Sequence, residues 1–149
     1  MNFKIFILFV LVCLTSCTKP DYDIVVVGGG ASGIVSAVQS SRMGSKTLLI
    51  EETDWLGGML TSAGVSAMDG NYKMPSGFLG EFRDSLVSRY GSLESLKTGW
   101  VSNIMFEPSV GNEILKNIAN KEKNLTIVYN SNVKQVLRKD KKWQLSFNS

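Results

Sequence analysis

The sequence has 149 residues and a formal net charge of +3, and 44% of its residues are hydrophobic. This length suits about one domain with its own core, and without an RNA- or DNA-binding motif the small charge excess does not indicate a nucleic-acid-binding protein. The chain contains no histidine. We therefore predict no metal site, and Ser/His and Cys/His catalysis are excluded.

The first 16 residues have the features of an export signal. Residues 1–4 are short and basic, and residues 5–14 are apolar but too few to form a stable membrane-spanning anchor. We therefore predict that residues 1–16 are removed and do not belong to the fold.

Residues 14–17, Leu-Thr-Ser-Cys, resemble the lipobox of bacterial lipoproteins. This resemblance implies that Cys17 is acylated and becomes the first residue of the mature chain. The alternative is ordinary signal cleavage, with Cys17 an incidental thiol. Under the first interpretation residues 17–22 form a short tether, and the protein is an exported, membrane-anchored lipoprotein facing the periplasm or the cell surface.

A strand, a glycine-rich turn and a helix follow the tether. Ile24–Val27 is an unbroken β-branched run, typical of a parallel strand covered on both faces by helices. Gly28, Gly30 and Gly33 have the spacing of a dinucleotide-binding turn, in which they allow a tight turn, close approach of a pyrophosphate and close helix packing. The N–H groups at the helix start, including those of Ala31 and Ser32, would face the phosphates.

A second apolar run, Thr47–Ile50, ends at Glu51. Glu51 lies eighteen positions beyond Gly33, about the spacing at which an acid reaches the adenosine ribose hydroxyls. Between the two runs, residues 32–43 are predicted to form the crossover helix, with Gly44 ending it. We also assign Glu52 to the cofactor site.

A glycine pair, Gly57 and Gly58, follows the acid by a few residues. This pattern resembles the FAD-dependent oxidoreductases with a glutathione-reductase-type Rossmann domain, and the resemblance extends over nearly all of residues 22–138. It implies FAD as cofactor, the first glycine turn as the pyrophosphate site and Glu51 as the ribose ligand. Gly57, Gly58 and Met59 match the segment that lies along the flavin dinucleotide.

Two more helices are predicted in the middle of the chain. Apolar residues recur at helical spacing from residue 78 to residue 90, and Pro108 suits the first turn of a helix that ends near Asn120. Residues 100–106 fit either a strand or a loop. Glu107 and Glu113 are interpreted as solvated or capping residues, because neither has a visible acid-base partner, so no catalytic residue is assigned.

The C-terminal part is predicted to be β-structure. Residues 125–129 form a third parallel strand, and residues 133–137 and 143–147 form an antiparallel pair around a polar turn at residues 138–142. We interpret the basic residues near this turn as solvated. In the resembled family such a pair begins a β-meander and its first strand meets the adenine ring, which implies a contact at Val133.

The sequence thus predicts an α/β fold, a Rossmann-like parallel sheet in the order three-two-one with the start of an antiparallel meander. Residues 23–149 would be the FAD-binding domain. The substrate domain and closing flavin segment of the resembled family are absent, so we expect a truncated product that binds FAD poorly by itself.

The predicted function is the cofactor-binding part of a lipid-anchored, FAD-dependent oxidoreductase, with the flavin carrying the redox chemistry. One alternative is an NAD(P)-binding oxidoreductase domain, against which the glycine pair argues. Another is a noncatalytic dinucleotide-binding or interaction module. The partners expected are FAD, an unidentified small-molecule substrate and the membrane, with no nucleic acid.

Overall fold

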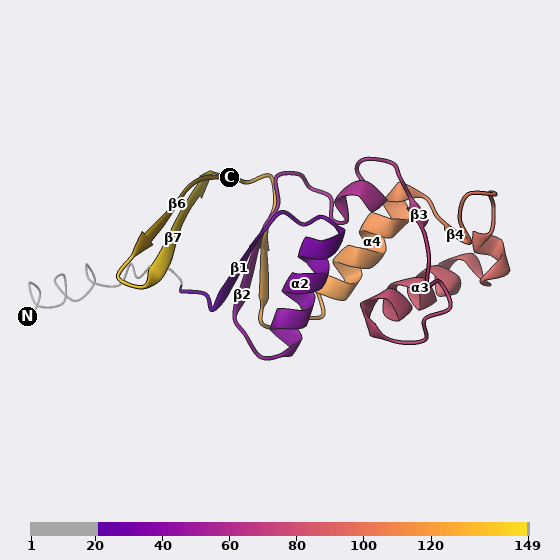
Figure 1. The fold of residues 1–149 in the computed structure, drawn as a ribbon, viewed down its shortest axis with the longest axis horizontal. Coiled ribbons are helices and arrows are strands. Elements are labelled where there is room, and N and C mark those ends of the chain that lie inside the picture. The colour runs from indigo at the N-terminus through magenta and orange to yellow at the C-terminus, as the bar shows by residue number, and fades with distance from the viewer. Residues whose placement is uncertain (1–20, 149) are drawn as a thin grey trace, which may run out of the picture.

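A three-stranded parallel sheet forms the centre of the fold (Figure 1). The structure is a computed structural model that describes residues 21–148, so the predicted signal peptide and Cys17 lie outside the described residues. Strands β1 (Ile24–Val27), β2 (Thr47–Ile50) and β5 (Leu125–Val128) lie in the order β1-β2-β5. This is the three-two-one order predicted from the sequence, and it is confirmed.

The crossover helices α2 (Ala31–Arg42) and α4 (Pro108–Ala119) pack on one face of this sheet. Alternate strand residues, among them Val26 and Leu49, share a buried cluster with side chains from both helices. Val27, which follows Val26 in β1 and points to the opposite face of the sheet, is 58% exposed. The expectation that helices cover both faces of β1 is therefore not met within residues 21–148, because both helices lie on the same side.

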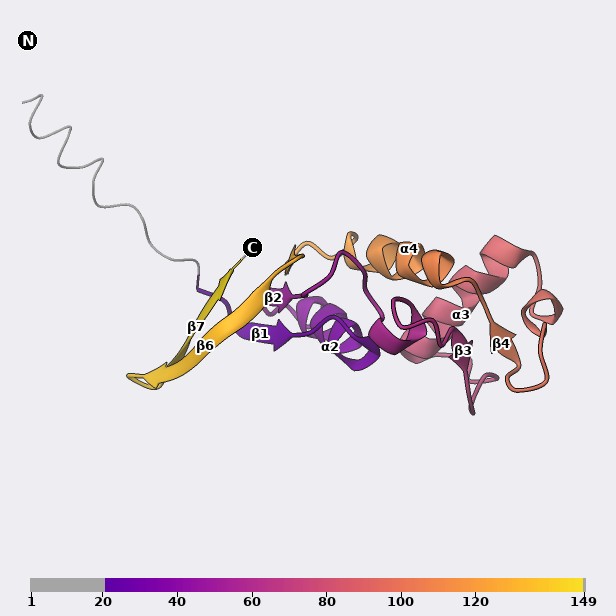
Figure 2. The same ribbon diagram turned by 90° about the horizontal axis from the view of Figure 1, so that it is seen from above.

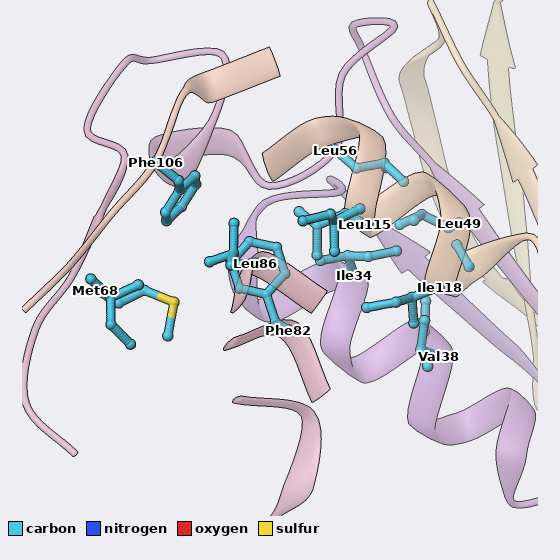
Figure 3. Packing of buried hydrophobic residues seen from close by; sticks show 14 of the residues in the cluster. Ile34, Val38, Leu49, Leu56, Met68, Phe82, Leu86, Phe106, Leu115 and Ile118 are labelled. Carbon is cyan, nitrogen blue, oxygen red and sulfur yellow. The ribbon is translucent and has the colours of Figure 1, made fainter. Parts of the chain in front are cut away.

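A second layer extends this core away from the sheet. Helix α3 (Gly77–Tyr90) packs beside α4, and the short strands β3 (Ala67–Met68) and β4 (Ile104–Met105) pair nearby. Figure 3 shows Phe82 of α3 among the side chains between these layers. The Phe82 ring packs edge-on against Phe106, with 5.4 Å between centroids. Residues 100–106, for which the sequence fitted either a strand or a loop, contain the two-residue strand β4.

Arg42, the last residue of α2, joins three parts of this helical layer. Its guanidinium donates two hydrogen bonds to Glu81 of α3, at 2.8 and 2.9 Å, and one to Glu122 after α4, at 2.8 Å. The bonds from Arg42 lower the pKa of the Glu81 carboxyl. All three side chains are partly exposed, so water weakens the attraction.

Strands β6 (Asn132–Lys139) and β7 (Lys142–Asn148) form the predicted antiparallel hairpin. It makes a separate two-stranded sheet beside the parallel one (Figures 1 and 2). The turn is shorter than predicted, because only Asp140 and Lys141 adopt positive φ angles, of 50° and 65°. Arg138, Lys139 and Lys142 therefore belong to the ladder instead of the turn.

Candidate dinucleotide-binding site

The glycine turn at the carboxyl end of β1 is constrained by its own backbone. Gly28 has a φ of +89°, and its N–H donates to the carbonyl of Ile50 over 2.8 Å. A Cβ on Gly33 would overlap the Gly28 carbonyl oxygen and lie 3.0 Å from the carbonyl carbon. Gly33 is thus required for α2 to sit against the turn, as its place in the motif predicted.

Helix α2 begins with unsatisfied donors. Gly30 is its N-cap residue and provides no side chain, while its carbonyl accepts the first helical bond from Ile34 at 2.9 Å. Within residues 21–148, the N–H groups of Ser32 and Gly33 have no backbone or side-chain acceptor outside the helix, whereas Ala31 adjoins the parallel bridge between Gly30 and Gly57. Together with the positive end of the helix dipole, these groups form a binding site suited to phosphate.

Glu51 is tied to the glycine turn by its carboxylate. The residue is only 7% exposed. One carboxylate oxygen accepts the Gly29 N–H at 2.6 Å, and the other accepts the Thr53 N–H at 2.9 Å and the Thr53 hydroxyl at 2.6 Å. Charge-assisted bonds of this length are strong. The predicted ribose ligand therefore also holds the turn in shape.

The second glycine loop folds against the first. The Gly57 N–H donates to the Gly29 carbonyl at 2.8 Å, and a Cβ on Gly58 would come within 3.0 Å of the Gly30 Cα. Both residues have positive φ angles, so side chains are disfavoured there for conformational reasons as well. Gly58 also begins the short 3-10 helix η1 (Gly58–Leu60).

Helix α4 supports this loop from below. Asn112 accepts the Leu56 N–H at 2.9 Å, and the buried Thr61 hydroxyl donates to the Leu56 carbonyl at 2.6 Å. Sequence reasoning missed both residues. Asn112 lies 56 positions from Leu56 in the chain, and a polar residue in the first turns of a helix is usually solvated. Thr53 could have been found, because a hydroxyl two residues after an acid can close a local turn.

These elements enclose a groove of about 290 Å³ across the carboxyl ends of β1 and β2. Six of the predicted cofactor residues line it: Gly28, Gly30, Glu51, Glu52, Gly58 and Val133. The other five flank the groove without lining it: Ala31, Ser32 and Gly33 in the first turn of α2, Gly57 in the loop, and the exposed Met59. Lining residues that were not predicted include Thr53, Ser62, Ser131 and Asn132.

The groove has an acidic part and, within residues 21–148, carries no basic side chain. Glu51 and Glu52 line it, the N–H groups at the start of α2 lie beside it, and no Lys or Arg of the described residues lines it. Burial, and secondly the charge of Glu51, raise the pKa of Tyr129, which does not line the groove. The hydroxyl groups of a ligand's ribose could donate hydrogen bonds to the acidic part of the groove, whereas the extra phosphate of an NADP-type ribose would be repelled there.

The described residues offer no metal cluster and no membrane-spanning helix. No group of three or more Cys, Asp or Glu side chains in residues 21–148 could together hold a metal ion. Within the same range, no helix combines the length and apolar character needed to cross a bilayer.

A parallel βαβ unit with a glycine turn, an open helix start and an acid after the second strand defines a Rossmann-type dinucleotide-binding protein. The profile of the family described as FAD dependent oxidoreductase matches residues 23–149. The chain belongs to this family, and FAD is accordingly its cofactor. The fold agrees with that of a steroid monooxygenase bound to NADP, with a TM-score of 0.53, 17% identity, and coverage of 87% of this chain and 23% of that one.

Shorter stretches of the chain resemble two named enzymes. The tRNA uridine 5-carboxymethylaminomethyl modification enzyme MnmG of Treponema pallidum (strain Nichols) is 36% identical over 76 residues, 47% of this chain and 12% of that protein. Dihydrolipoyl dehydrogenase of Trypanosoma brucei brucei is 44% identical over 43 residues, 29% of this chain and 9% of that protein. The chain thus spans about a tenth of the length of these relatives.

The site fits the cofactor of the family on its own geometry. A Cβ on Gly30 would meet nothing within 4 Å, so a pyrophosphate can approach the turn, and the free donors of α2 lie beside it. The groove is near the lower limit of about 300–1,000 Å³ for pockets that bury a whole small ligand. It therefore suits the adenosine and pyrophosphate portion.

Proposed function

We propose that this chain holds FAD for an oxidoreductase reaction. The observation that carries the proposal is the bonded unit of Gly29, Glu51 and Gly57, which joins the pyrophosphate turn, the acid and the second glycine loop. Glu51 would accept a ribose hydroxyl with its remaining lone pair, and the first N–H groups of α2 would hold the pyrophosphate. Bound flavin would supply the redox chemistry, while the protein contributes binding and orientation.

The test is a competition that separates the two ends of the cofactor. FAD and ADP both carry the adenosine and pyrophosphate groups, whereas FMN lacks adenosine. If the proposal is right, ADP displaces FAD from the chain in a fluorescence titration and FMN does not. Equal binding of FMN and FAD would contradict the assigned site. Substrate-dependent bleaching of the flavin would then distinguish an oxidoreductase from a noncatalytic binding module.

We further propose that the protein is exported and anchored through an acylated Cys17. Support comes from the apolar segment before residues 14–17 and from the lipobox resemblance of those residues. Intact-mass analysis of protein from the membrane fraction would show a chain that begins at Cys17 and carries acyl chains. A soluble chain, or one that begins at Met1, would refute the anchor without affecting the FAD proposal.

A further inference from the structure

The β6–β7 hairpin carries most of the excess positive charge of the chain. Its 17 residues, 132–148, contain five basic residues and one acid, Asp140. Four of the basic side chains lie at or near the tip and a fifth, Lys134, lies near the base of β6; all five are exposed, the four at the tip being Arg138, Lys139, Lys141 and Lys142. A strand pair with so little compensating charge suits an anionic partner.

The same hairpin also exposes apolar and aromatic side chains on one face. Val136 pairs with Leu145 and Arg138 with Trp143, so these four side chains point to the same side. Val136 is 50% exposed and Trp143 is 64% exposed. The Arg138 guanidinium lies over the Trp143 ring, 5.7 Å from its centroid. Tryptophan beside lysine and arginine is the composition favoured where a protein meets the interface of a bilayer.

The hairpin tip lies beside the end of the chain that would carry the anchor. Lys142 Nζ is 3.1 Å from a carboxylate oxygen of Asp21. Both side chains are well exposed, so this ion pair adds little stability but shows that the two segments are neighbours. Asp21 follows Cys17 by four residues, a stretch of at most about 14 Å when fully extended. An acyl chain on Cys17 would therefore keep the tip close to the membrane surface.

We propose that the β6–β7 hairpin is a second membrane contact, which rests its basic tip and Trp143 on an anionic lipid surface. The proposal rests on the anchor at Cys17 for its geometry. It also sets the distance of the cofactor site from the tip: Val133, near the base of β6, lines the groove and lies six residue steps of extended strand from Lys139, roughly 20 Å. The groove would then be held away from the bilayer surface.

The experiment measures quenching of tryptophan fluorescence by brominated lipid. Acylated full chain from the membrane fraction is reconstituted in vesicles of equal parts phosphatidylcholine and brominated phosphatidylglycerol. We expect quenching that Trp143→Phe removes and that Trp100→Phe, a control at another exposed tryptophan, leaves in place. Quenching that survives Trp143→Phe would overturn the proposal.

The charge component is tested with two triple variants of the unacylated Cys17→Ala chain. One variant replaces the three lysines at the tip, Lys139, Lys141 and Lys142, by glutamine. This variant should bind phosphatidylglycerol vesicles about tenfold or more weakly than the Cys17→Ala chain. The matched control removes three exposed lysines elsewhere: Lys73, Lys121 and Lys123. If both triple variants bind the vesicles equally weakly, the loss of binding follows from net charge alone, and a specific membrane-binding surface on the hairpin is refuted.

The two proposals fail separately. If intact mass shows no acylation, the anchor is refuted, and the vesicle binding of the Cys17→Ala chain alone decides on the hairpin. If acylation is found but Trp143 is not quenched, the hairpin contact is refuted and the anchor stands. Absence of binding by the unacylated chain to phosphatidylglycerol vesicles, together with an unquenched Trp143, would likewise overturn the contact.

Discussion

Replacing Gly33 by alanine should separate the helix from the glycine turn. The new Cβ would overlap the Gly28 carbonyl oxygen and lie 3.0 Å from its carbon. The obstacle is backbone at the end of a strand, so no side-chain rotation can relieve it. Forced overpacking costs about 1–3 kcal/mol, and the rigid neighbour places this substitution near 3 kcal/mol. For a domain of this size that cost lowers Tm by roughly 10 °C.

The matched control is Gly30→Ala, three residues earlier in the same turn. Gly30 has φ −60° and ψ 179°, which any residue can adopt, and a Cβ there would meet nothing within 4 Å. We expect its stability to stay within about 1 kcal/mol of the unmodified chain, because alanine caps helices less well but also restricts the unfolded chain. FAD should nevertheless bind more weakly, since the Cβ enters the space left for the pyrophosphate.

Thermal unfolding of the full chain and FAD fluorescence titration together check this pair. Gly33→Ala should lose both stability and FAD affinity, whereas Gly30→Ala should lose affinity only. If Gly33→Ala unfolds at the temperature of the unmodified chain, the packing argument is wrong. If Gly30→Ala binds FAD normally, the pyrophosphate does not approach the turn at that position.

Two further substitutions test individual contacts. Glu51→Gln replaces the carboxylate that accepts the Gly29 N–H by a neutral amide. Fluorescence titration should then show FAD affinity reduced about tenfold or more, and thermal unfolding should show roughly 1–3 kcal/mol of lost stability. The control is Glu52→Gln, at an exposed groove residue, which should change stability little. Glu81→Gln should cost below about 1 kcal/mol at pH 7. Because Arg42 lowers the Glu81 pKa, this stability is present above the ordinary value of 4.5 and disappears as pH falls below it, so unfolding curves should converge in acid. A pH-independent difference would contradict that origin.

The parts of the site that the sequence predicted are those fixed by local geometry. The glycine spacing follows from the short distance between the β1 turn and the first turn of α2, and the structure shows Gly33 in the packing role expected of it. Glu51 could be placed because the crossover helix between two parallel strands has a nearly fixed length. The strand order followed from the same rule, since successive right-handed βαβ units add strands on one side.

The parts that the sequence could not give depend on distant segments. Asn112 caps the loop at Leu56 only because α4 passes beneath it, and nothing in the sequence near residue 112 signals that contact. The exposure of Val27 had the same cause: a β-branched run indicates a strand but not how many faces its neighbours cover. The basic hairpin turn was interpreted as solvated, and its position beside Asp21 emerges only from the fold.

The glycine turn of the site is held in shape by bonds within the protein. The buried charge of Glu51 is already satisfied by Gly29 and Thr53, and the Gly57 N–H already closes on the Gly29 carbonyl. Bonds of this kind, made by the protein itself, favour one shape of the turn, and such preorganisation lowers the ordering cost that usually weakens association. The same carboxylate thus has two assigned purposes: its charge fixes the shape of the turn, and we propose that its remaining lone pair accepts a hydroxyl of the ligand.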